Sequence, residues 1–94
     1  MGLKFEWDDR KAESNQKKHG VSFEEASTVF ADFLSLTIPD PLHSEEEERL
    51  VITGYSDKQR LLVVVHTERK NTIRIISTRK AKLYERKTYE GSND

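Results

Sequence analysis

Two neighbouring β-rich segments constrain the fold of this chain more than any other part of its sequence. Residues 61–67, LLVVVHT, form a nearly continuous apolar run, and residues 72–78, TIRIIST, are rich in β-branched side chains. The polar residues 68–71 separate the two runs, and Asn71 tolerates the left-handed backbone that a tight turn often needs. Two such runs around a polar turn predict a β-hairpin. Both runs are too apolar for a strand with one solvated face, so we expect the hairpin at the buried centre of a sheet.

The second strand of this hairpin also carries cations towards one end of the sheet. Arg74 interrupts its apolar pattern, and Arg79 and Lys80 end it. Because Arg binds phosphate through two parallel hydrogen bonds, such a strand end suits a phosphate ligand. Regular alternation predicts that one side of the sheet holds Ile73, Ile75, Ser77 and Arg79, and the other side Arg74, Ile76 and Thr78.

Before the hairpin, short patterns predict a strand and two helices. Residues 3–7 alternate apolar and charged side chains, as a half-buried strand does. Asp8 is the predicted N-cap of a helix from Asp9 to about Lys18, and Gly20 is a natural left-handed stop for that helix.

A capping box predicts where the second helix begins. Ser22 has the N-cap position, and Glu25 follows three residues later. We expect this helix to end near residues 31–32. Alternating apolar residues then predict strands at 34–38 and 49–55.

The remaining signals complete the predicted order β-α-α-β-β-β-β-α. Gly54 predicts a bulge in its strand, and Thr78 is the expected N-cap of a last helix from Arg79 to about Tyr89. The predicted fold class is therefore α+β, with a small antiparallel sheet, two N-terminal helices and one C-terminal helix. With 94 residues, the chain is long enough for one modest core, so we expect a single domain over 1–94.

Composition and charge narrow the class of function. The chain has no Cys, which fits a reducing cytoplasm, and no apolar run approaches the ~18 residues of a membrane span, so we expect a cytoplasmic protein with no membrane partner. Ten of the sixteen Lys and Arg residues lie in 58–89, against only Glu68 and Glu85 of the seventeen acidic residues. This asymmetry suggests a basic surface for a polyanion, although charge alone allows a merely solvated helix equally well.

The sequence lacks the motifs of nucleotide-dependent and zincin chemistry, and its three histidines are far apart. We therefore expect no cofactor and no metal. RNA can be cut without metal when its own 2′-hydroxyl attacks the adjacent phosphate, given a base, an acid and cations for the developing charge. The residues that could supply these groups are Lys18, His19, His66, Arg74, Arg79, Lys80 and Glu85. For His66, a hydrogen-bonded place inside the sheet remains an open alternative.

The sequence resembles BrnT-type toxins over nearly its whole length. The blocks that carry the resemblance are KFEWD at 4–8, KHGVSFEEA at 18–26, IPD at 38–40, RLLVVVHTER at 60–69 and RIISTRKA at 74–81, with Lys11, Asn15, Arg49, Gly54, Glu85 and Tyr89. The family often has Ala at the position of Thr78. The resemblance implies a type II toxin with a RelE-like fold that acts as a metal-independent ribonuclease, of the mRNA interferase kind, and so inhibits translation.

The same resemblance implies a cognate, BrnA-like antitoxin of the ribbon-helix-helix type, which blocks the toxin and alone contacts operator DNA. We predict a hydrophobic contact with it through Phe33, Leu34 and Leu42. For the RNA substrate, the predicted catalytic residues are His66, Arg79, Arg74, Lys80 and Glu85, and the predicted RNA-binding residues are Lys18, His19, Arg60, Arg69 and Lys82.

Two other functions remain open from the sequence. A non-catalytic module that binds nucleic acid or a protein partner would use the same basic face of residues 58–89. Phosphate binding and phosphate cleavage require the same cationic side chains, so the sequence does not separate the two functions. A small metal-dependent enzyme is the third possibility, which the scattered histidines hardly support.

Overall fold

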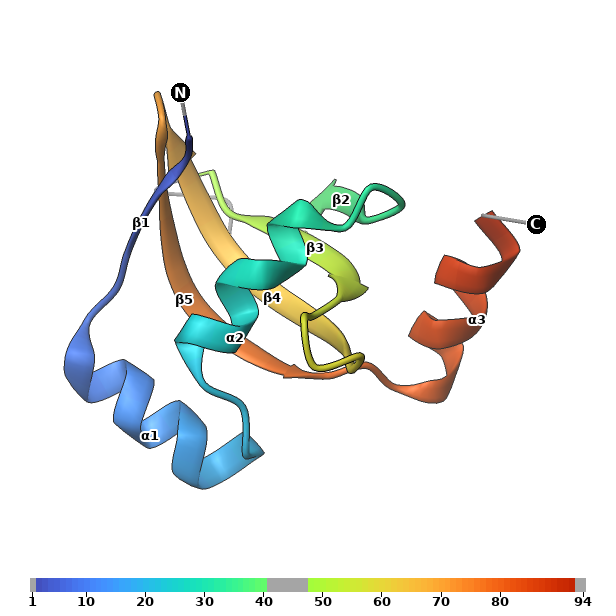
Figure 1. The fold of residues 1–94 in the computed structure, drawn as a ribbon, viewed down its shortest axis with the longest axis horizontal. Coiled ribbons are helices and arrows are strands. Elements are labelled where there is room, and N and C mark those ends of the chain that lie inside the picture. Colours follow the sequence, from blue (N-terminus) through green and yellow to red (C-terminus); the bar gives the residue numbers. More distant parts are fainter. Residues whose placement is uncertain (1, 41–47, 93–94) are drawn as a thin grey trace.

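The predicted order of helices and strands is confirmed. The structure, a computed structural model, describes residues 2–40 and 48–92 (Figure 1). Its elements are β1 (Lys4–Glu6), α1 (Asp9–His19), α2 (Phe23–Thr28), a short 3-10 helix (Val29–Ala31), β2 (Leu36–Pro39), β3 (Leu50–Tyr55), β4 (Leu61–Arg69), β5 (Thr72–Lys80) and α3 (Leu83–Ser92). None of the helices in these two ranges is long and apolar enough to cross a membrane.

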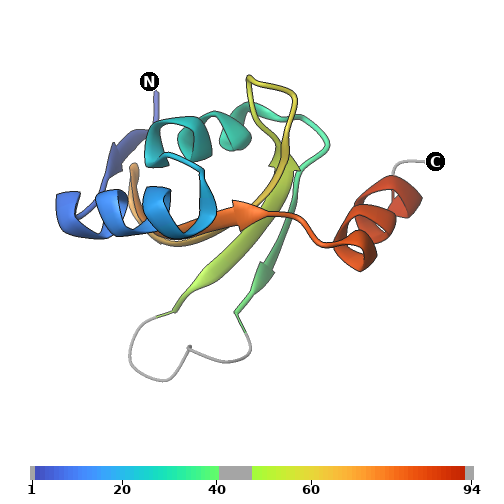
Figure 2. The same ribbon diagram turned by 90° about the horizontal axis from the view of Figure 1, so that it is seen from below.

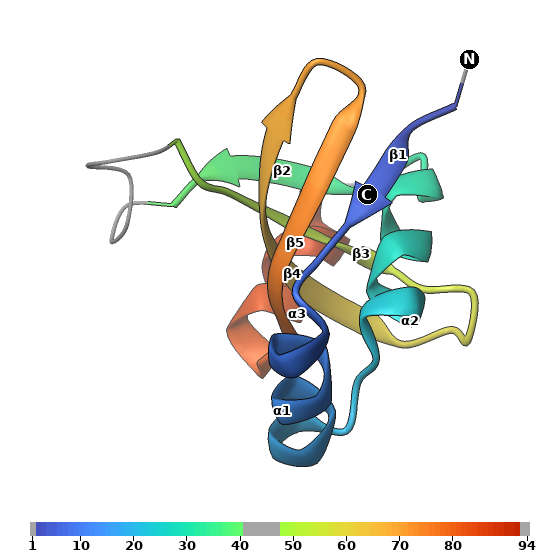
Figure 3. The same ribbon diagram turned by 90° about the vertical axis from the view of Figure 1, so that its left-hand side faces the viewer.

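The strands form one sheet in the order β1-β5-β4-β3-β2. The β4–β5 hairpin lies at its centre, as predicted, and β2, β3, β4 and β5 pair antiparallel. The α+β class is therefore confirmed, with one difference: β1 lies parallel to β5, so the sheet is mixed (Figure 3). A parallel pair requires a long connection between its strands, and here that connection is all the chain between β1 and β5.

The two N-terminal helices lie on the same face of the sheet, whereas α3 stands apart beyond the end of β5 (Figure 2). The core lies between these two helices and the sheet, and its buried members are Val21, Phe23, Ala26, Val29, Ile52, Leu62, Val64, Ile73 and Ile75. We call the face turned away from α1 and α2 the open face. Because α1 and α2 bury one face, any ligand of the sheet must approach from the open face or its rim.

A β-bulge in β5 decides which side chains reach the open face. Val65 pairs with Ser77 but His66 pairs with Ile75, so Ile76 is an extra residue without a partner in the β4–β5 ladder. The predicted alternation is therefore wrong across this point. Ile75 lies in the core, while Arg79 and Arg74, on either side of the extra residue, both belong to the open face.

The last helix begins later than the sequence predicts. Thr78 is not a helix cap, because β5 continues to Lys80. The backbone N–H of Thr78 donates to Asn15 Oδ1 at 3.1 Å, and Asn15 Nδ2 donates to the Thr78 carbonyl at 2.9 Å. Asn15 thus takes the place of a neighbouring strand where β1 no longer covers the edge of β5.

Helix 2 has the predicted cap but not the full capping box. Ser22 Oγ accepts a hydrogen bond from the Glu25 backbone N–H at 3.0 Å, and Gly20 (φ 70°) ends α1 as predicted. The Glu25 carboxylate instead accepts hydrogen bonds from Ser56 Oγ at 2.7 Å and from Arg60 Nε at 2.9 Å. Buried next to a cation, this carboxylate joins α2 to the turn before β4.

Two backbone predictions also differ. In the hairpin turn, Lys70 (φ 56°) and not Asn71 takes the left-handed conformation. Gly54 pairs regularly with Leu62, so it marks no bulge. The position leaves little room for a side chain, because a Cβ there would come 3.0 Å from atoms of Val29, Asp32 and Ser35.

Candidate functional site

The open face carries a pocket of about 570 Å³, which we call the central pocket. It is lined by His19, Ile38, Asp40, Arg49, Val51, Val63, Val65, Ile76, Ser77, Arg79, Tyr84 and Glu85. Aliphatic side chains of β2, β3, β4 and β5 contribute a large apolar part of the lining. Charged and polar side chains come from strand ends, from the last residue of α1 and from the first turn of α3. An apolar floor with a few convergent polar groups is the usual composition of a ligand site.

Arg79 and Glu85 form a bidentate ion pair at this pocket. Arg79 Nη1 donates to Glu85 Oε1 at 2.7 Å, and Arg79 Nη2 donates to Glu85 Oε2 at 2.8 Å. A third hydrogen bond runs from Arg79 Nη1 to the Lys80 carbonyl at 3.2 Å. The Arg79 side chain is still 32% exposed, so its fixed guanidinium remains accessible to a ligand.

This pair also sets the charge of Glu85. The hydrogen bonds from Arg79 lower the pKa of Glu85, although burial opposes them, and the Lys82 backbone N–H, 2.8 Å from Glu85 Oε1, lowers it further. Glu85 is therefore ionised at neutral pH. Such a carboxylate orients Arg79 and is a weak proton acceptor, because a lowered pKa means a low affinity for protons.

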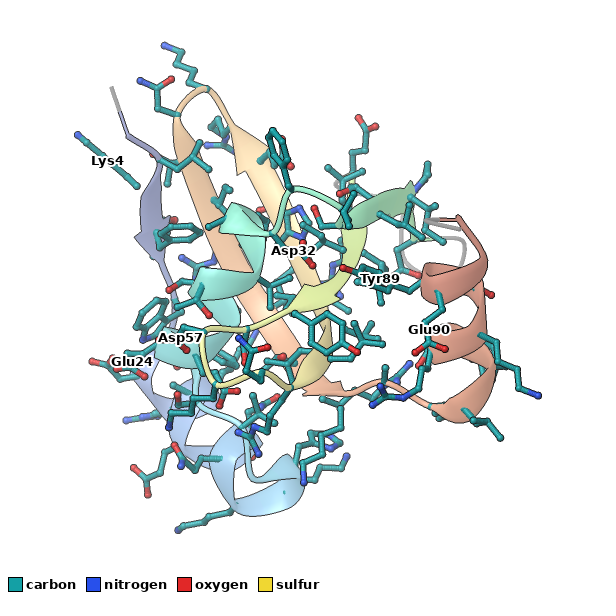
Figure 4. All side chains as sticks on the ribbon, turned by 45° about the vertical axis from the view of Figure 1, so that its right-hand side comes forward. Lys4, Glu24, Asp32, Asp57, Tyr89 and Glu90 are labelled. Atoms are coloured by element: carbon teal, nitrogen blue, oxygen red, sulfur yellow. The ribbon has the colours of Figure 1, made fainter. Side chains whose placement is uncertain are left out.

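A second carboxylate holds α3 at the border of the pocket. Asp32 Oδ2 accepts hydrogen bonds from the Tyr89 hydroxyl at 2.7 Å and from the Tyr55 backbone N–H at 2.8 Å, and Oδ1 accepts one from the Leu34 backbone N–H at 3.0 Å. Figure 4 shows Asp32 and Tyr89 pointing toward one another. The rings of Tyr55 and Tyr89 meet edge to face at 5.5 Å, and Arg86 Nη1 donates to the Tyr55 hydroxyl at 3.2 Å.

We call the hydrogen bond between Asp32 and Tyr89 the clamp. Its surroundings shift the pKa values of both residues. Burial and the hydrogen bond to Asp32 raise the pKa of Tyr89 to about 12. Burial of Asp32 would raise the pKa of that carboxyl, but the donors from Tyr55, Leu34 and Tyr89 outweigh it and the pKa is lowered. At neutral pH, α3 is thus held by an ionised carboxylate and a neutral phenol.

Three of the ten predicted site residues line the central pocket: His19, Arg79 and Glu85. Lys18, Lys80 and Lys82 are exposed on the surface and do not line it. Arg60 is bound to Glu25, and its Nη2 donates to the Gly20 carbonyl at 3.3 Å, so this predicted RNA-binding residue has a structural contact.

His66 lies on the core side of β4, outside the central pocket. Its side chain is fully buried, and its ring packs edge to face on Phe30 at 4.8 Å. Its Nε2 lies 3.1 Å from Glu68 Oε2, and its Nδ1 lies 3.4 Å from the Val64 carbonyl. The structure thus places His66 where the hydrogen-bonded alternative would have it.

Arg69 and Arg74 line a different pocket near the hairpin turn, of about 500 Å³, which we call the turn pocket. Its other lining residues are Glu6, Thr67, Lys70 and Thr72.

Sequence reasoning missed several residues of the central pocket, among them Asp40, Arg49 and Tyr84. Asp40 is buried, and its backbone N–H donates to the Arg49 carbonyl at 2.9 Å, which extends the β2–β3 pairing by one step. The sequence predicts a loop at Asp40, which lies between two prolines, and no local pattern indicates that this residue is buried. Tyr84 could have been found from its position one residue before Glu85, in the first turn of the last helix. In the described ranges, no three His, Asp or Glu side chains form a group that could hold a metal ion.

Comparison with known proteins agrees with the resemblance read from the sequence. Residues 7–85 match the family model described as the ribonuclease toxin, BrnT, of type II toxin–antitoxin systems. The crystal structure of the Brucella abortus ribonuclease toxin BrnT has the same fold, with a TM-score of 0.62 and 22% sequence identity over 85% of this chain and 97% of that chain. No curated protein sequence matches the chain. Because the family model spans most of its length, the chain belongs to the BrnT family of ribonuclease toxins of type II toxin–antitoxin systems.

Proposed function

We propose that this chain is an endoribonuclease of the mRNA interferase kind that cleaves RNA in the central pocket, without a metal ion or cofactor. The observation that carries the proposal is Arg79, which is fixed by Glu85, partly exposed, and in the same pocket as His19. A fixed guanidinium beside a group that can move a proton is what phosphodiester cleavage by an internal nucleophile needs.

The proposed reaction starts with the 2′-hydroxyl of the RNA. Its oxygen attacks the adjacent phosphorus as its proton passes to a base, and the bond from phosphorus to the 5′-oxygen of the next nucleotide breaks as that oxygen takes up a proton. The products are a 2′,3′-cyclic phosphate and a 5′-hydroxyl. Arg79 binds the phosphate oxygens and stabilises the charge that grows on them, because a guanidinium offers paired donors in a plane.

His19 is our candidate for moving a proton in this reaction. An imidazole can both accept and donate a proton, and His19 lines the central pocket from the end of α1. His66, in contrast, is buried among core residues and would need a rearrangement of β4 to reach RNA. Glu85 acts through Arg79, as the residue that orients it. The exposed ring of Tyr84 is a surface on which a base can stack.

The chemical test uses an RNA with a single 2′-deoxynucleotide at the cleavage position. We expect cleavage at that position to stop, cleavage of the unmodified RNA to leave a cyclic phosphate, and both results to be the same in excess EDTA. Cleavage of the deoxy-substituted RNA, or activity that EDTA abolishes and Mg²⁺ restores, would contradict the mechanism. RNA binding with no cleavage under any of these conditions would favour the non-catalytic module instead.

The family also implies an antitoxin, which we propose is a BrnA-like ribbon-helix-helix protein encoded next to this chain. In this proposal the antitoxin blocks the central pocket and alone contacts operator DNA, and the toxin acts on mRNA in the cytoplasm. Induction in a bacterial host with and without the neighbouring reading frame, followed by mapping of RNA ends, tests both parts. Growth arrest that the neighbour does not relieve would contradict the proposed partner.

A further inference from the structure

The turn pocket is a second basic site on the sheet. Its lining brings together three cationic side chains, Arg69, Lys70 and Arg74, with the hydroxyl groups of Thr67 and Thr72. Glu6 of β1 is the single carboxylate among its lining residues. The pocket therefore has an excess of positive charge and hydroxyl donors, which suits an anion.

The turn pocket and the central pocket lie on the same face of the same two strands. Along β4, Val63 and Val65 line the central pocket, and Thr67 and Arg69, at the same alternate positions, line the turn pocket. Along β5, the bulge at Ile76 brings Arg74 to the face that also carries Arg79. If these residues followed regular alternation without a bulge, Arg74 and Arg79 would lie on opposite faces of the sheet.

The contact of Arg74 with Glu6 leaves this cation available to a ligand. Arg74 Nη1 lies 3.1 Å from Glu6 Oε2, and the two side chains are 46% and 53% exposed. An exposed ion pair of this kind contributes little to stability, so a phosphate can replace the carboxylate at small cost.

The spacing of the two pockets fits a flexible polyanion with repeated charges. Arg79 pairs with Val63 and Arg74 pairs with Thr67, four residues further along β4, which corresponds to about 13 Å along a strand. Between them lie the aliphatic side chains of Val65 and Ile76 at the border of the central pocket. A single-stranded nucleic acid combines phosphates at regular intervals with apolar faces of sugars and bases, whereas an acidic peptide offers mainly charge.

From these observations we propose that Arg69 and Arg74 form a second phosphate-binding site, so that single-stranded RNA lies along β4 and β5 and contacts both pockets. The proposal deepens the proposed function, since it rests on RNA occupying the central pocket. It makes Arg74 a substrate-binding residue and not a catalytic one. It also implies that the protein prefers RNA segments long enough to span both pockets.

The test is equilibrium binding of RNA with 2′-O-methyl groups, which cannot be cleaved by attack of the 2′-hydroxyl. A short probe that fits one pocket is compared with a probe of about ten nucleotides, long enough for both. The double variant Arg69→Gln/Arg74→Gln is compared with Arg10→Gln/Lys17→Gln, which removes the same charge from exposed positions of α1. Melting temperatures of both variants verify that they fold.

We expect the Arg69/Arg74 variant to bind the long probe about 10- to 30-fold more weakly at ~0.1 M salt, with a salt slope lower by about 1.4, since each phosphate contact in a single strand contributes about 0.7. The short probe and the α1 variant should show little change. In cleavage assays KM should rise while kcat at saturating RNA stays within about twofold, because these residues do not touch the reacting phosphate.

Equal losses in the two variants, or no loss for the long probe, would overturn the proposal. So would competition by poly-glutamate as strong as that by RNA of equal charge, since the turn pocket would then belong to a protein partner. Because binding is measured without cleavage, failure of the proposed catalytic role of Arg79 would not produce any of these results.

Discussion

At the scale of single residues, Arg79 connects the proposed chemistry to the fold. Its bonds to Glu85 join the end of β5 to the first turn of α3, and the Arg79 side chain is partly exposed. An exposed ion pair contributes about 0–1 kcal/mol to stability, and a bidentate, partly buried pair such as this one contributes somewhat more. The same guanidinium can contribute far more to a reaction, because it meets the charge that develops in the transition state.

We therefore predict that Arg79→Ala leaves a folded protein with about 10²–10³-fold slower RNA cleavage, by analogy with removal of one oxyanion donor. Cleavage rate and melting temperature should be measured on the same preparation, with Arg10→Ala as a control for loss of a surface arginine. Full toxicity of Arg79→Ala would remove Arg79 from the site, and lost toxicity with a collapsed melting temperature would make it structural.

A second prediction at this scale concerns the cap of α2. Ser22→Ala removes the acceptor for the Glu25 backbone N–H and should lower the free energy of unfolding by about 0.5–2 kcal/mol, with no effect on RNA cleavage. Ser14→Ala, at an exposed position inside α1, is the matched control and should have little effect. Denaturant unfolding of the two variants measures the difference, and an unchanged midpoint for Ser22→Ala would contradict the role of the cap.

Sequence could identify Arg79 and Glu85 as site candidates but could not choose between the histidines. The run at 61–67 is apolar on both faces, so alternation gave no sign that His66 points into the core. The sequence predicts His19 as an RNA-binding residue, from the set of side chains that could supply a base, an acid or a cation. Its neighbours in the central pocket come from β2 and α3, which lie far away along the chain, so no local pattern indicates that contact.

At the scale of elements, α3 depends on the clamp made by Asp32 and Tyr89. Among the described residues, α3 packs mainly on β3, and Tyr89 lies one helical turn after Glu85. The sequence predicted this helix but placed its start at Arg79, because Thr78 followed by charged residues has the form of a cap. The competing bonds come from Asn15, which is 63 residues away and invisible to a local pattern.

We predict that Tyr89→Phe lowers the free energy of unfolding by about 1.5–3 kcal/mol at neutral pH, the usual contribution of a hydrogen bond to a charged group. The pKa of Tyr89 is raised from 10.0 to about 12, so this contribution is fully present below pH 10 and is lost as the pH rises towards 12. The difference in stability between the wild type and Tyr89→Phe should therefore shrink over that interval.

Ultraviolet absorbance of phenolate, titrated in the wild type and in Tyr89→Phe, measures the pKa of Tyr89 directly. Tyr84→Phe, which changes an exposed tyrosine of the same helix, is the control for loss of a hydroxyl. A difference in stability that does not change with alkaline pH would contradict the clamp.

At the scale of the whole molecule, the two faces of the sheet have different roles: one is buried in the core, and the open face is available to ligands. Helices α1 and α2 cover one face of the sheet (Figure 2), and the charged side chains that line the two pockets lie on the other. Fold class, element order and the central hairpin were predictable because they depend on periodicity, which is a local property. The parallel pairing of β1 and the position of α3 depend on long-range contacts, which periodicity does not report.

Binding of the antitoxin is predicted to rely on apolar contact and not on charge alone. Phe33 is fully exposed and Leu34 is half-exposed in the turn before β2, while Leu42, the third predicted contact, lies outside the described residues. In ~1 M salt the Debye length is only about 3 Å, so a purely ionic complex would dissociate there. We expect the complex to persist at this salt concentration and Phe33→Asp to weaken it without a change in melting temperature.

Size-exclusion chromatography in high salt and titration calorimetry measure the two effects. Leu83→Asp, at an exposed apolar position on α3, is the control for a new surface charge. Full dissociation in high salt, or equal weakening by both variants, would contradict a hydrophobic contact at Phe33.

The bulge at Ile76 has a consequence for how the gene can change in length. A point substitution there keeps the number of residues between Arg74 and Arg79, so both side chains keep their orientation. Loss of the codon for Ile76 would leave the pairs Val65–Ser77 and His66–Ile75 next to one another in a regular ladder, with every side chain on its present face. Loss or gain of one residue that leaves the bulge in place would instead turn the side chains on one side of the change to the opposite face, so that either Arg79 enters the core or Ile73 and Ile75 leave it. We therefore expect homologous toxins that share this site to differ in length between the two arginines only by the presence or absence of the bulge residue.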